Sequence, residues 1–168
     1  MRSKAATSPD ADLRLVFGRL STVDLELIRT SLVQADGELH QLAIDLAQRS
    51  GLRFETTGIT LDEFEGGAWA APGAVLFGYV DGGDPRDSVA FVADLHRADD
   101  ADRWHVSADV QVEPPAAAGA TGGLLGTSDV PERSYDTPVA AAAGLLDVVR
   151  DLRKLAATRP PTGPAWRA

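Results

Sequence analysis

The residue types of a hydrolase triad occur close together in the segment that holds His105, Ser107 and Asp109. Residues two apart on a strand point to the same side and stand about 6.6 Å apart. A triad instead needs hydrogen bonds of roughly 2.6–3.2 Å between side chains from different elements. The spacing therefore favours a polar strand face, and no catalytic residue is assigned. Should this face line a groove, His105 and Asp109 are the candidates for catalysis.

Acidic residues and histidine also gather just before Trp104. They are Asp94, His96, Asp99, Asp100 and Asp102, and a second acidic turn holds Asp81, Asp84 and Asp87. Asp and His bind divalent metals, but neither group has the acids, central glycine and distant glutamate of a calcium loop. We predict no metal site and no cofactor. His96 with Asp94 is the second candidate pair for a polar ligand site.

A glycine-rich segment follows, with Gly119, Gly122, Gly123 and Gly126. A phosphate-binding loop requires Gly-Lys followed by Ser or Thr, and a dinucleotide fingerprint requires a strand leading directly into the glycines. Neither pattern is present, so the segment is interpreted as a linker or lid.

The charge is strongly acidic and uneven. The chain has 25 acids and 16 Lys or Arg, a net charge of −9, and ten of the acids but only three bases lie between Asp62 and Arg103. Such a field repels phosphate backbones and anionic lipid, which argues against nucleic-acid and membrane binding. It suits a basic protein partner, with Trp69 as a loop anchor. The alternatives are a solvated face that aids solubility and a Trp69 side chain folded over an edge of the sheet. The partner-binding candidates are Trp69, Asp81, Asp84, Asp87, Asp94, Asp99, Asp100 and Asp102.

Cysteine is absent from the 168 residues, which excludes disulfides, zinc ribbons and thiol nucleophiles and fits a reducing cytoplasm. There is no signal-peptide pattern and no apolar run of about 18 residues that would span a membrane.

Hydrophobic periodicity predicts the elements that carry these residues. Helical spacing covers Leu13 to Leu20, with a short strand as the alternative because of Gly18. A capping box at Ser21 opens a helix that a turn at Asp36-Gly37 ends. A second helix then runs to Gly51. After Gly51 the period changes to two, which predicts strands over 53–60, 74–80, 88–95 and 104–112. Thr137-Pro138 opens a final helix.

These elements predict an α+β fold: N-terminal helices, an antiparallel sheet of about four meandering strands, and a C-terminal helix packed on one face. We expect residues 1–10 and 158–168 to be disordered. Residues 11–157 form one domain with a mobile Ala- and Gly-rich loop over 114–136.

The function expected from these observations is that of a small acidic bacterial protein-binding module without enzymatic activity, in the manner of immunity or chaperone-like proteins. The alternative is a small-molecule-binding or lyase-type domain with a pocket between sheet and helices. We also expect a homo-oligomer if the apolar strand Ala74 to Val80 lies at the sheet edge, where it could pair across a two-fold axis.

Overall fold

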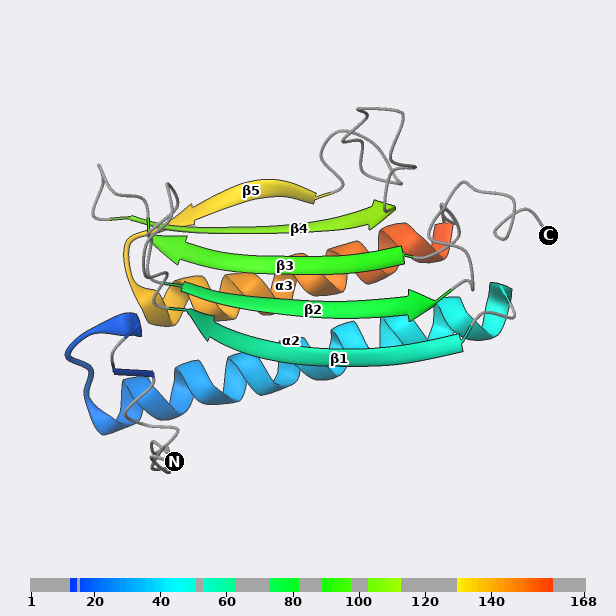
Figure 1. Ribbon diagram of the computed structural model, residues 1–168. Helices are drawn as coiled ribbons and strands as arrows, with labels where there is room; N and C mark the ends of the chain where they lie inside the picture. Colours follow the sequence, from blue (N-terminus) through cyan, green and yellow to red (C-terminus); the bar gives the residue numbers. More distant parts are fainter. Residues whose placement is uncertain are drawn as a thin grey trace, which may run out of the picture.

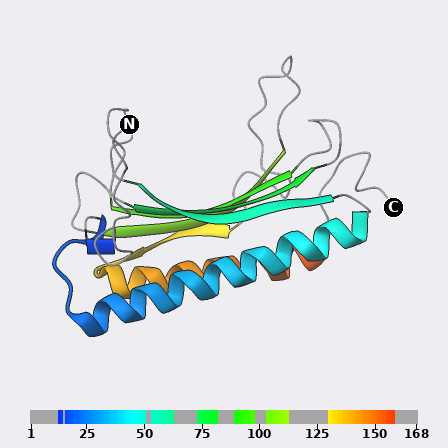
Figure 2. The ribbon, with the colours of Figure 1, turned by 60° about the horizontal axis from the view of Figure 1, so that its bottom comes forward.

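Two long helices lie side by side under one face of a five-stranded antiparallel sheet in the computed structural model (Figures 1 and 2). The structure describes residues 13–14, 16–50, 53–62, 73–81, 89–97, 103–112 and 130–158. The helices are α2 (Thr22–Ser50) and α3 (Pro138–Thr158). The strands are β1 (Arg53–Asp62), β2 (Gly73–Asp81), β3 (Val89–Arg97), β4 (Trp104–Val112) and β5 (Val130–Tyr135), in that spatial order. The predicted α+β class, with the C-terminal helix on one face of the sheet, is confirmed.

Helix α2 is one continuous helix. The Ser21 hydroxyl accepts a hydrogen bond from the Asp24 amide at 3.1 Å, as the predicted cap requires. The predicted turn at Asp36-Gly37 is wrong, because the helix continues through both residues. Ala35 and Leu39 are fully buried and keep the helical period unbroken across the glycine. Burial of this apolar stripe outweighs the roughly 1 kcal/mol that glycine costs inside a helix.

A short helical segment precedes α2 at residues 13–14 and 16–17, where helical spacing was predicted. Gly18 ends it with a φ of 83°, and its amide donates to the Arg14 carbonyl at 2.9 Å. This left-handed conformation favours glycine, which stops the helix and turns the chain toward α2. Phe17 then packs on Trp104 with ring centroids 5.2 Å apart.

Helix α3 begins as its sequence predicts. Thr137 caps the first turn by accepting from the Ala140 amide at 3.2 Å, and Pro138 takes the first helical position. Leu145, Val148 and Leu152 are fully buried against the sheet. Because α2 covers β1 and β2 while α3 covers β3, β4 and β5, the two helices together close one face.

Alternation along the strands assigns the two faces of the sheet. Phe91, Ala93 and Leu95 on β3 are fully buried, and so are Val106 and Ala108 on β4. Side chains on the intervening positions point away from the helices. The predicted buried and polar faces of β4 are thus confirmed for the residues from Trp104 to Ala108.

The sheet has a fifth strand that the sequence analysis did not predict. β5 lies inside the segment 114–136 that was expected to be a mobile loop, and the rest of that loop falls outside the described residues. Proline rarely occurs inside a sheet, so Pro131 argues against a strand in this segment. β5 is an edge strand, however, where proline is tolerated. Its pairing with β4 shifts register between Val106 and Ala108.

The strand expected to mediate self-association lies inside the sheet. β2 pairs with β1 on one side and with β3 on the other. Its backbone groups are therefore used within the chain, and the predicted edge-to-edge contact through Ala74 to Val80 is wrong. Of the ends that were expected to be disordered, residues 1–10 and 158–168, Thr158 is the last residue of α3, and all the others lie outside the described part of the chain. No helix among the described residues is long and apolar enough to cross a membrane.

Candidate functional site

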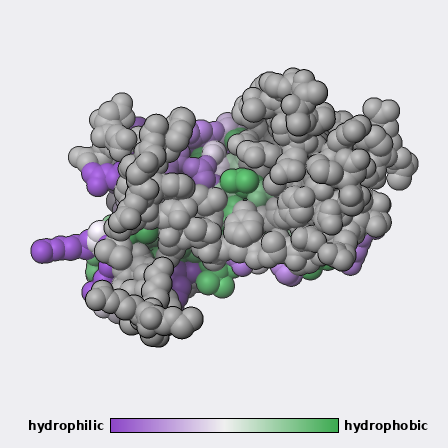
Figure 3. Space-filling model, viewed as in Figure 1, coloured by the Kyte–Doolittle hydropathy of each residue, from purple (hydrophilic) through white to green (hydrophobic). Residues whose placement is uncertain are grey.

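Strands β3 and β4 hold a group of polar side chains on the face of the sheet opposite the helices. Asp94 and His96 lie two apart on β3, and their cross-strand neighbours on β4 are Ser107 and His105. The four side chains are partly buried, with His105 exposed to 20%. Figure 3 shows hydrophilic side chains on this side of the molecule, beside apolar ones nearer its centre.

The Asp94 carboxylate joins the two strands. Ser107 Oγ donates to Asp94 Oδ1 at 2.5 Å, and His96 Nδ1 lies 2.7 Å from Asp94 Oδ2. Because an ionised carboxylate only accepts hydrogen bonds, the proton of the neutral His96 ring is on Nδ1. The pairing of His96 with Asp94 that the sequence suggested is therefore present in the structure.

His105 takes its partners from β5. Its Nδ1 lies 3.1 Å from Glu132 Oε1 and 3.1 Å from Ser134 Oγ. The His105 ring also stacks on the His96 ring, with centroids 5.6 Å apart and an interplanar angle of 21°. Two imidazoles, each oriented by its own carboxylate, thus lie side by side across three strands.

This arrangement differs from a hydrolase site. The serine hydroxyl donates to the carboxylate of Asp94, so Ser107 is not aligned with a basic imidazole nitrogen. In the described ranges no three His, Asp or Glu side chains are grouped to hold a metal ion. The chemistry that the cluster supports is the binding of hydrogen-bond donors and cations by oriented carboxylates.

We call this surface the open face and define it by Asp94, His96, His105, Ser107, Glu132 and Ser134. Sequence reasoning identified the residues on β3 and β4 but missed Glu132 and Ser134. Their spacing by two was the available signal, and Pro131 obscured it.

Asp109, the predicted partner of His105, lies on β4 opposite Val92, and its side chain is not among those that the structure describes. Asp81 is the last residue of β2 and pairs in register with Arg53. The remaining partner-binding candidates all lie outside the described residues: Trp69, Asp84, Asp87, Asp99, Asp100 and Asp102.

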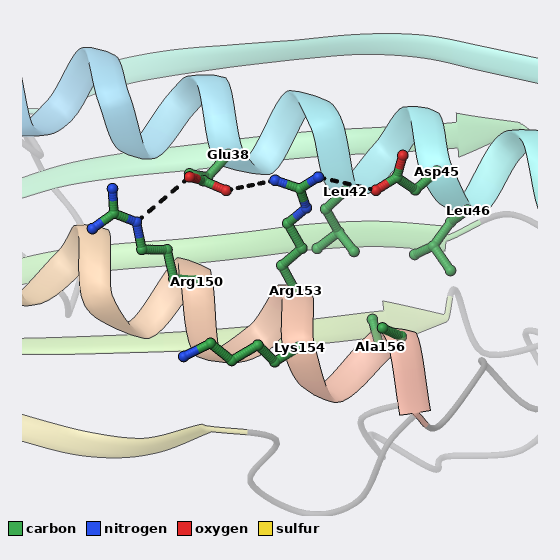
Figure 4. Close-up of a pocket in the computed structure, with 9 residues that line it drawn as sticks. Glu38, Leu42, Asp45, Leu46, Arg150, Arg153, Lys154 and Ala156 are labelled. Carbon is green, nitrogen blue, oxygen red and sulfur yellow. Dashed lines mark hydrogen bonds and ion pairs between the residues drawn. The ribbon is translucent and has the colours of Figure 1, made fainter.

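A second concave surface lies on the helix side, between α2 and α3 (Figure 4). Leu42, Leu46 and Ala156 are among its apolar lining residues, and the groove holds about 430 Å³. Around it stand two acids from α2 and three bases from α3, which are Glu38, Asp45, Arg150, Arg153 and Lys154.

Arg153 is the centre of the charge pairs in this groove. Its guanidinium donates to Glu38 at 2.8 Å and to Asp45 at 3.3 Å, while Arg150 Nε lies 3.5 Å from Glu38. The hydrogen bond from Arg153 is the main reason that the pKa of Glu38 lies below its usual value. These pairs join helices that are more than 100 positions apart in sequence, so helical periodicity alone could not reveal them.

A third connection ties the edge strand to the helix layer. Arg133 on β5 donates to Asp151 on α3 at 2.5 Å, which raises the pKa of Arg133 and lowers that of Asp151. Arg133 points toward the helices, whereas its neighbours Glu132 and Ser134 join the open face. This ion pair therefore holds β5 where its other side chains meet His105.

No family model, curated protein or solved structure matches this chain.

Proposed function

We propose that this chain is a non-enzymatic protein-binding module whose open face receives a basic segment of a partner protein. The observation that carries the proposal is the position of Asp94 and Glu132, two carboxylates held by neighbouring imidazoles on the side of the sheet opposite the helices. The cysteine-free sequence supports a cytoplasmic location for this module.

A basic partner is inferred from the net charge of the chain and from the carboxylates of the open face. The whole chain carries a net charge of −9, which attracts a cationic partner over long range. At short range, Asp94 and Glu132 accept the charge-assisted hydrogen bonds that Lys and Arg donate. The contacts to His96 and His105 already orient both carboxylates, so binding loses less side-chain entropy.

The proposal is tested with a short Lys- and Arg-rich peptide and amide chemical-shift mapping of the labelled chain. We expect shifts concentrated on β3, β4 and β5, and a loss of affinity of about tenfold or more in Asp94→Asn with Glu132→Gln. Asp147→Asn with Glu26→Gln is the matched control, because both residues are exposed acids on the helices and the pair removes the same two negative charges.

Two outcomes contradict the proposal. One is a peptide that shifts residues of the helices while leaving β3, β4 and β5 unchanged. The other is an equal loss of affinity in the control variant, which would show attraction to net charge alone.

The groove between α2 and α3 favours a second candidate function, the binding of a small anionic amphiphile. Its volume falls in the range of ligand sites, and its apolar lining with Arg150 and Lys154 at the rim suits a short acyl chain with a carboxylate. The layer between sheet and helices, where a pocket was expected, holds the apolar core.

Decanoate should raise the melting temperature of the wild-type chain but not of the double variant Arg150→Gln with Lys154→Gln. No rise in the melting temperature of the wild type counts against this function.

A further inference from the structure

The outer surface of α2 carries a repeat on the side of the helix that faces away from the sheet. Val23, Leu27, Thr30 and Gln34 follow one another at alternating intervals of four and three residues, and all four are exposed. This is the spacing of the contact positions of a coiled coil. Val23 is 68% and Leu27 49% exposed, and Val33, which lies beside the repeat, is 60% exposed.

The same spacing continues through the second half of the helix. Gly37, Gln41, Ile44 and Gln48 extend it to the last turns of α2, and none of them is buried. We call these eight positions the outer seam. The core side chains of α2, such as Ile28 and Leu39, point the opposite way, toward the sheet.

Charge sets the outer seam apart from the rest of the molecule. No seam position carries an ionisable side chain, although 24% of the chain is charged and the net charge is −9. Two copies of such an acidic chain repel each other over most approaches. A neutral surface is where that repulsion between copies is smallest, which favours a second copy as the occupant of the seam.

We propose that two copies of the chain pair through the outer seam of α2, with the helices antiparallel. The seam is self-complementary about the peptide between Ala35 and Asp36, because its positions are placed symmetrically on either side. Leu27 then faces Ile44 of the partner subunit, and Gln34 faces Gly37 of the partner subunit. A two-fold axis requires this kind of self-matching surface.

Gly37 fits this arrangement better than it fits an isolated helix. A Cβ added at Gly37 meets nothing within 4 Å, so packing within the chain does not require glycine there. Glycine costs roughly 1 kcal/mol in a helix interior. In the dimer its lack of a side chain leaves room for Gln34 of the partner subunit. The two sheets lie on the outside, so each open face stays available.

The test uses the charge of substitutions at Gly37. In the antiparallel register the two copies of residue 37 lie about 4.5 Å apart along the helix axis. Gly37→Glu and Gly37→Lys should each weaken the dimer about tenfold or more through like-charge repulsion. An equal mixture of the two variants should recover association as a heterodimer. Sedimentation equilibrium measures all three, against a chain mass of 17.7 kDa.

The controls are Pro131→Glu and Pro131→Lys on the exposed edge of the sheet, which change the net charge in the same way and should leave association unchanged. Circular dichroism confirms that each variant folds. A wild-type chain that sediments at 17.7 kDa at every concentration overturns the proposal. A dimer that survives either Gly37 substitution, or a mixture that stays monomeric, overturns it equally.

Discussion

Two acids that lie two positions apart on α2 have pKa values shifted in opposite directions. Glu38 accepts hydrogen bonds from Arg153 and Arg150, and its pKa lies below the usual 4.5. Asp36 has one carboxylate oxygen without a hydrogen-bond partner among the described residues, and desolvation raises its pKa above 3.8. The ionised form of Glu38 is therefore favoured in the folded chain and that of Asp36 is disfavoured.

These directions predict the pH dependence of stability. Because the pKa of Glu38 is lower in the folded state, its contribution is complete above pH 4.5 and is lost as the pH falls through the folded pKa. At neutral pH Glu38→Gln should lower the free energy of unfolding by about 1 kcal/mol, and the difference from wild type should shrink in acid. Urea unfolding at several pH values measures this.

Asp36 should show the reverse sign. Ionised Asp36 destabilises the fold at pH values above its raised folded pKa, and the penalty is relieved as the pH falls through that value. Asp36→Asn should therefore stabilise the chain at neutral pH and lose its advantage in acid. A destabilising effect at neutral pH would show that the ionised carboxylate has a favourable partner.

The two helices each contain a glycine, and their surroundings predict opposite effects of alanine. At Gly37 an added Cβ meets open space, so Gly37→Ala should raise the unfolding free energy by about 1 kcal/mol in the monomer. At Gly144 an added Cβ would lie 2.3 Å from the Tyr135 ring, so that ring must move. Gly144→Ala should lower stability by about 1 kcal/mol or more.

Thermal melts of both variants at low concentration test this pair. Tyr135→Leu provides the control for Gly144, because removing the ring should reduce the cost of the added methyl group. If both alanine variants stabilise equally, Tyr135 does not pack on the helix as described.

The next prediction concerns the ion pair between Arg133 and Asp151, which links β5 to α3. Arg133→Gln and Asp151→Asn should each speed amide hydrogen exchange in β5, since each breaks the ion pair that joins this edge strand to the helix. A double-mutant cycle should give a coupling of about 0.5–1 kcal/mol, because both side chains are more than a third exposed. Exchange unchanged in β5 would mean that backbone pairing with β4 alone holds it.

For the whole molecule, the two proposed contacts should respond to salt in opposite ways, because one joins opposite charges and the other joins two chains of like charge. Peptide binding at the open face is an attraction between opposite charges, so added salt should weaken it. Association through the neutral outer seam acts against repulsion between two chains of charge −9, so added salt should strengthen it. Measuring both equilibria across one salt series tests the assignments together; the same sign for both would contradict one of them.

Most of the elements, and which of their faces is buried, could be predicted from the hydrophobic pattern of each segment. Buried Leu25, Ile28 and Leu32 follow the helical period, and the alternation around Val106 correctly placed His105 and Ser107 away from the core. These predictions succeed because the spacing of apolar residues within one segment reflects which side of that helix or strand is buried. The sequence also named Asp94 and His96 as a candidate pair. The two share a face because β3 continues past the predicted end at Leu95.

The contacts between elements that are distant in the sequence follow from how the whole chain packs. The contact of Glu132 with His105 depends on how β5 pairs with β4, and the pairing of Glu38 with Arg153 depends on which helix faces lie together. The continuity of α2 through Gly37 was likewise set by burial of Ala35 and Leu39 against other elements. Long-range pairing is a property of the packed chain: the free energy of burying several elements together overrides the local preference of a glycine or a proline.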